Sequence, residues 1–129
     1  MVLMDETLFV MQTSGIENPE AYIHVSGLNL TAAVLGETVK SEDEYQVRTA
    51  SKMVTAIKQS ALVITAIDMT KTASITLKGE NDITVRVGSV DEIEGKLQKA
   101  YDIMEVLKAD GKQGGTLDVT TSKGGSYLP

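Results

Sequence analysis

The chain has 129 residues, a length typical of one domain. Of these residues 42% are hydrophobic, which is enough to form a core without disulfides or bound metals. Twelve basic and eighteen acidic residues give a net charge of −6, which argues against nucleic-acid phosphates and anionic lipid surfaces as partners. The lack of cysteine excludes disulfides, thiolate nucleophiles and the usual zinc cages.

Short alternating segments predict the first strands. Residues 2–11 are typical of two short apolar strands around a polar turn at Asp5-Glu6. A loop follows over residues 12–20, and alternation returns over residues 21–25 before Gly27. No apolar run approaches the ~18 residues that a membrane-spanning helix requires.

The first helix is predicted from about Glu42 to Ala61. Ser41 and Glu44 have the spacing of a capping box, in which a hydroxyl and a carboxylate satisfy free amides at the start of a helix. Apolar residues then recur at helical spacing, at Val47, Ala50, Val54, Ile57 and Ala61. Residues 63–69 are rich in β-branched side chains and predict a strand.

Residues 75–119 carry the clearest pattern. Two alternating segments, Ile75–Leu77 and Ile83–Val87, predict a pair of strands joined by a polar turn. From Ser89 the apolar period becomes about 3.6, which predicts a helix that stops at Gly111, with a second capping-box spacing at Ser89–Glu92. Alternation resumes at Leu117–Val119.

These patterns predict the fold class. We expect a single α+β domain over residues 1–129, with a mostly antiparallel sheet packed against two amphipathic helices. One apolar stripe of the second helix should cover the sheet. Its members are Val90, Ile93, Leu97, Met104 and Leu107. We expect them to pack on Ile75, Leu77, Val85 and Val119, or on the opposite-parity neighbours of these residues if the register differs by one.

No set of side chains has the spacing of a catalytic or metal site. His24 is the single histidine, and in its predicted strand we expect it to be solvated rather than a catalytic base. The acidic groups fit a turn and the first turns of helices, where carboxylates complement the helix dipole. They are Asp5-Glu6, Glu42-Asp43-Glu44 and Asp91-Glu92. We therefore predict no enzyme activity, no cofactor and no metal.

Several segments resemble the distal β domain of the bacterial division protein family FtsQ, called DivIB in Gram-positive bacteria. The family has a strand ending in glycine, a helix with Glu-Lys-Leu, and a closing Asp-centred strand, similar to Ile83–Gly88, Ile93–Leu97 and Leu117–Val119. Gly95 here separates the Glu-Lys pair, which departs from that pattern. Two earlier segments also resemble the family, Val2–Val10 at the entry and Val25–Leu28 with its glycine.

The resemblance implies a non-catalytic divisome scaffold on the extracytoplasmic side of the bacterial membrane, at the division septum. The implied partners are FtsB/DivIC-like and FtsL-like bitopic proteins. It also implies that this chain is a fragment, which in the full-length protein follows a single transmembrane helix and a POTRA domain. The alternative is a small ligand-binding or hydrolytic α+β domain. A closed apolar pocket with converging carboxylates would favour that alternative, and an open sheet edge would favour the scaffold.

The C-terminal end of the chain is the predicted partner site. Leu117–Thr121 is the final predicted strand and precedes a tail of small residues, so we expect it at a sheet edge that can accept an added strand. The resemblance also implies partner binding along the closing strand. Carried over by position, the site comprises Thr120, Thr121, Ser122, Lys123 and Gly124. The alternative is that the tail folds back and covers this edge.

Overall fold

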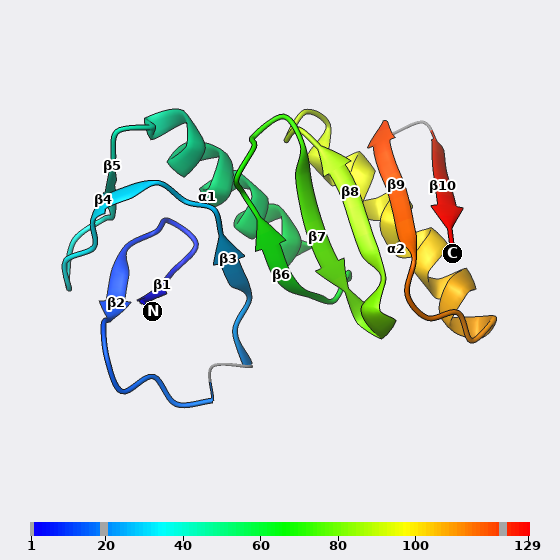
Figure 1. The fold of residues 1–129 in the computed structure, drawn as a ribbon, viewed down its shortest axis with the longest axis horizontal. Coiled ribbons are helices and arrows are strands. Elements are labelled where there is room, and N and C mark those ends of the chain that lie inside the picture. Colours follow the sequence, from blue (N-terminus) through cyan, green and yellow to red (C-terminus); the bar gives the residue numbers. More distant parts are fainter. Residues whose placement is uncertain (1, 19–20, 122–123) are drawn as a thin grey trace.

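A six-stranded mixed sheet forms the body of the structure, a computed structural model that describes residues 2–18, 21–121 and 124–129 (Figure 1). The strand order is β10-β9-β8-β7-β6-β3. The β3–β6 and β8–β9 pairs are parallel and the other three are antiparallel, which confirms the mostly antiparallel α+β prediction. The strands are β3 His24–Ser26, β6 Ile64–Asp68, β7 Ile75–Gly79, β8 Thr84–Gly88, β9 Thr116–Thr121 and β10 Gly124–Leu128.

Two helices, α1 (Glu44–Gln59) and α2 (Ile93–Ala109), lie on the same face of this sheet (Figure 1). Each helix connects two parallel strands, because α1 lies between β3 and β6 in the chain and α2 lies between β8 and β9. Such crossovers almost always have one hand. Since β6 and β8 both run antiparallel to β7 and both crossovers proceed in the same direction along the sheet, the two helices share a face.

The helix starts differ from the capping-box predictions, which were wrong at both sites. Asp43, not Ser41, caps α1, and its carboxylate accepts the Gln46 amide at 3.0 Å. The α2 helix begins at Ile93 because Glu92, in a left-handed conformation with φ 54°, ends the preceding loop and makes no side-chain cap. Ser89 instead bonds within that loop, donating to the Asp91 carboxylate at 3.2 Å.

The stop of α2 at Gly111 is confirmed. Gly111 has φ +69°, and its amide bonds the Lys108 carbonyl at 3.1 Å, while the Lys112 amide bonds the Leu107 carbonyl at 2.9 Å. This pair of bonds is a Schellman motif, in which a left-handed residue turns the chain back to satisfy the last helical carbonyls. The chain then enters β9 from the end of the helix.

The N-terminal residues form two small two-stranded sheets beside the main one. They are β1 (Leu3–Met4) with β2 (Val10–Gln12), and β4 (Leu30–Ala32) with β5 (Lys40–Ser41). A bridge between Phe9 and Thr38 connects these two sheets. Three side chains of this region are buried in the core that it shares with the main sheet. They are Leu8, Val10 and Val39.

The core lies between the sheet and the helices, as the alternating pattern predicted. Ile93, Leu97, Met104 and Leu107 are all buried there, and Val90 is half-buried. The sheet residues facing them are also buried, namely Ile75, Leu77, Val85, Val87, Leu117 and Val119. The opposite face carries polar residues in the intervening positions, such as Thr76, Lys78, Arg86 and Asp118.

Leu97 gives a direct test of this packing, since it is 1% exposed at the centre of the α2 stripe. We expect Leu97→Ala to lower the free energy of unfolding by about 2–5 kcal/mol, because truncation of a buried leucine removes transfer energy and leaves a cavity. Chemical denaturation measures this. Val106→Ala is the control on the same helix, where the side chain is 60% exposed and little change is expected. Equal midpoints for the Leu97 variant and the wild type would contradict this position for the helix.

Candidate functional site

The described residues of the predicted partner site lie where β9 and β10 meet. The strand at this edge of the sheet is β10 and not the predicted Leu117–Thr121. The expectation that Leu117–Thr121 is the last strand is wrong, because β10 pairs antiparallel with β9 and takes the edge position. Thr120 and Thr121 end β9 with exposed side chains, and Gly124 begins β10 opposite Thr121. Ser122 and Lys123 lie outside the described residues. The alternative that the tail folds back over this edge is therefore the arrangement observed.

Glycine explains how this tail can close against the body of the protein. A Cβ on Gly125 would lie 2.5 Å from Ile103 Cδ1 of α2 and 3.3 Å from the Asp118 carbonyl oxygen. The Ile103 contact involves the flexible end of a side chain, so the absence of a side chain on Gly125 favours the close approach of β10 to the helix and to β9 without being essential to it. Tyr127 then packs on the core, and its hydroxyl donates to the Gly114 carbonyl at 2.8 Å.

A bulge in β9 lies directly beside Gly125. Asp118 pairs with Ser126 and Thr121 pairs with Gly124, so two residues of β9 face one residue of β10. The Asp118 carboxylate supports this bend by accepting the amide of Thr120 at 2.9 Å and its hydroxyl at 2.8 Å. These bonds from Thr120, together with the nearby Arg86 guanidinium, hold the pKa of Asp118 below its ordinary value.

The outer side of β10 is open. Among the described residues, β10 has one strand neighbour, β9. Its five residues include no charged residue and no proline, which are the usual protections of a sheet edge. Leu128 is 71% exposed at the end of this strand. The arrangement is suited to pairing with another strand rather than to chemistry.

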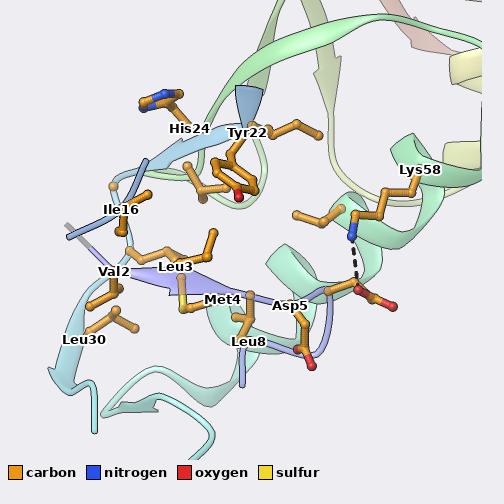
Figure 2. A pocket seen from close by; sticks show the side chains of 16 residues that line it. Val2, Leu3, Met4, Asp5, Leu8, Ile16, Tyr22, His24, Leu30 and Lys58 are labelled. Carbon is orange, nitrogen blue, oxygen red and sulfur yellow. Dashed lines mark hydrogen bonds and ion pairs between the residues drawn. The ribbon is translucent and has the colours of Figure 1, made fainter. Parts of the chain in front are cut away.

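A second feature is a cavity of about 460 Å³ near the opposite end of the sheet (Figure 2). Its walls come from β1, β3 and α1, and most of its lining is apolar. The apolar residues of this lining include Leu3, Met4, Ile23, Val25, Leu28 and Val54. Its rim carries Asp5, Glu6 and Lys58.

The carboxylates at this rim are engaged in local contacts and do not converge on the cavity. Asp5 Oδ1 accepts the amide and hydroxyl of Thr7 at 2.8 and 2.6 Å and the amide of Phe9 at 3.1 Å, so it holds the turn between β1 and β2. These bonds lower the pKa of Asp5. Glu6 forms an ion pair with Lys58 at 3.1 Å (Figure 2). This geometry does not favour a hydrolytic site, which needs carboxylates directed at a substrate.

The remaining titratable groups give no catalytic arrangement in the parts of the chain that the structure describes. His24 is exposed in β3, and its ring points away from the middle of the cavity (Figure 2). Across the described ranges, no three histidine or carboxylate side chains are placed to hold a metal ion. In the same ranges, no helix is both long enough and apolar enough to cross a bilayer.

Comparison with known protein families gives one match. Residues 2–120 match the family described as "Cell division protein FtsQ/DivIB, C-terminal". A search of curated proteins found no match. The family match includes most of β9 but ends before β10. Because it spans well over half of the chain, this protein belongs to the FtsQ/DivIB family and is a domain with a role in bacterial cell division, on the extracytoplasmic side.

The contact between Asp118 and Thr120 predicts a measurable pH effect. A carboxyl group with a lowered pKa stabilises the fold above its unfolded pKa, and this contribution is lost as the pH falls through the folded pKa. We expect Thr120→Val to raise the Asp118 pKa part of the way to its ordinary value, since the backbone bond remains. The variant should also lose less stability than the wild type on acidification.

A carboxyl NMR titration of Asp118, with denaturation at pH 6 and pH 3, measures both effects. The control is Thr31→Val, which changes an exposed threonine of β4 and should leave the Asp118 pKa as it is. An unchanged pKa in the Thr120 variant would show that the hydroxyl does not contribute.

Proposed function

We propose that this FtsQ/DivIB-family chain is a non-catalytic scaffold of the divisome that binds FtsB/DivIC-like and FtsL-like bitopic proteins during septum formation. In this proposal residues 1–129 form the single β domain, and a transmembrane helix and a POTRA domain precede it in the full-length protein. The family membership supports the cell-division role. The binding mode rests on the geometry of the sheet edge.

The open edge of β10 is the observation that carries this proposal. A partner segment in extended conformation would add to β10 as a seventh strand, and main-chain hydrogen bonds would supply much of the affinity. The originally predicted Thr120, Thr121 and Gly124 lie at the end of the β9–β10 pair, beside this surface. Ser122 and Lys123 stay within the proposed site by their position in the chain.

The side chains of β10 support recognition on one face. Ser126 and Leu128 pair with Asp118 and Thr116, so they lie on the polar face of the sheet, opposite the helices. Tyr127 is directed to the helix side and packs on the core. A partner strand would therefore meet an exposed leucine on one face and a half-buried tyrosine, hydrogen-bonded to Gly114, on the other.

The alternative, a ligand-binding or hydrolytic domain, has one observation in its favour, the apolar cavity beside β3. Its hydrolytic form is weaker, because Asp5 and Glu6 at the rim are engaged with Thr7, Phe9 and Lys58. The scaffold is the better supported function.

Leu128→Asp tests strand addition at β10. Leu128 is 71% exposed, so we expect the fold to persist, while affinity for a soluble FtsB/DivIC-like segment falls about tenfold or more because a charge would be placed in the interface. Isothermal titration calorimetry measures the affinity, and circular dichroism measures the fold. The matched control is Val63→Asp, which places the same charge at a residue 52% exposed beside β6, four strands from β10. Equal losses in both variants, or none in either, would contradict binding at this edge.

A further inference from the structure

The cavity at the opposite end of the sheet lies between two strand edges. Among the described residues, β3 has β6 as its strand neighbour and β1 has β2. Residues of β1 and β3 line the same cavity, and α1 closes one side of it (Figure 2). We propose that this cavity is a second docking site, which takes an extended apolar segment of a partner protein as a strand between β1 and β3.

The main chain of β3 can accept such a segment. The Ser26 carbonyl accepts the Met69 amide at 2.8 Å, and Ser26 pairs with Asp68 in the parallel register. In a parallel pair, residues alternate in the direction of their main-chain groups. Because Ser26 bonds toward β6, the N–H and C=O of Val25 point to the other side, away from β6. A bound strand would give these groups hydrogen-bond partners.

The side chains favour an apolar occupant. The cavity of about 460 Å³ has a volume typical of binding sites. Val25 of β3, Ile23 just before it, and Leu3 and Met4 of β1 are half-buried, so apolar area on both walls is still open to water. Covering this area would remove it from water, which favours binding of an apolar segment.

The charges at the rim of the cavity indicate which kind of partner segment would bind there. The rim holds the carboxylates of Asp5 and Glu6 and one ammonium group, Lys58, so its fixed charge is −1, and the chain carries −6. Asp5 and Glu6 are carboxylates with ordinary pKa values well below 7, and both pKa values are lowered further here, so both groups are ionised near neutral pH. A segment with basic residues flanking its apolar ones therefore suits this rim better than an acidic one.

A peptide fits these observations better than a small apolar molecule. A small molecule could fill the apolar volume, but it would leave the outward main-chain groups of β3 without partners. An added strand satisfies the apolar walls and the main chain together, and it would join the β1–β2 sheet to the six-stranded sheet. This site is separate from the β10 edge, and either could exist without the other.

The experiment uses the 129-residue chain and a fluorescent peptide, Lys-Val-Thr-Ile-Thr-Val-Lys, which alternates apolar and polar residues between basic ends. We expect saturable binding with a Kd between about 10 μM and 1 mM. Methylation of alternate peptide amides should weaken binding about tenfold, because it removes main-chain donors and keeps the side chains. Tyr22→Lys, at a cavity residue 45% exposed, should weaken it to a similar extent, because it places a positive charge beside the basic peptide and removes an aromatic wall.

The controls separate this site from other surfaces. Tyr45→Lys changes a tyrosine that is 56% exposed on α1 and does not line the cavity, and it should bind the peptide as the wild type does. Leu128→Asp should also leave binding unchanged, and a loss there but not in Tyr22→Lys would place the peptide at β10 and overturn the proposal. No binding at about 1 mM peptide would overturn it too. So would equal binding of the methylated peptide, which would assign the cavity to apolar molecules without a main chain.

Discussion

Parallel pairing of β8 with β9 is the constraint on which the rest of the structure depends. Two consecutive parallel strands cannot be joined by a short turn, so the chain must cross the sheet, and here it does so through α2. This crossover places Leu97 and Met104 over the sheet and aligns β9 so that the tail can return as β10. The β3-α1-β6 crossover repeats the arrangement at the other end, and both helices therefore cover one face.

The acidic residues of this chain act mainly as local structural groups. Asp5, Asp68 and Asp118 each accept the amide of a threonine two positions later. Hydrogen bonds from the hydroxyl and amide of that threonine lower the pKa of each aspartate. An aspartate that bonds its own backbone in this way fixes a turn or a bend. The same carboxylates are then poorly placed for acid–base chemistry. This agrees with a protein whose function rests on surfaces.

The two ends of the sheet present different surfaces. At one end β10 is an uncharged edge strand with one exposed leucine, which suits the proposed pairing through main-chain bonds. At the other end β3 borders an apolar cavity and faces a second strand, β1. The β3-α1-β6 crossover leaves β3 at one edge of the sheet, and the antiparallel return of the tail against β9 places β10 at the other. The two proposed docking surfaces therefore lie at opposite ends of the sheet.

The sequence by itself determined the features that depend on local periodicity. Alternation at Ile75–Val87 predicted the central strands, the 3.6-residue stripe containing Leu97 predicted α2, and Gly111 predicted its end. Tertiary structure alone decided the rest. The five residues of β10 show little apolar alternation, so their sequence does not predict a strand. They pair with β9 because there is space for them beside β9 and Ile103. The start of α2 depends on the left-handed conformation of Glu92, which has no periodic signal in the sequence. The cavity is lined by segments distant in the chain, so local periodicity does not predict it either.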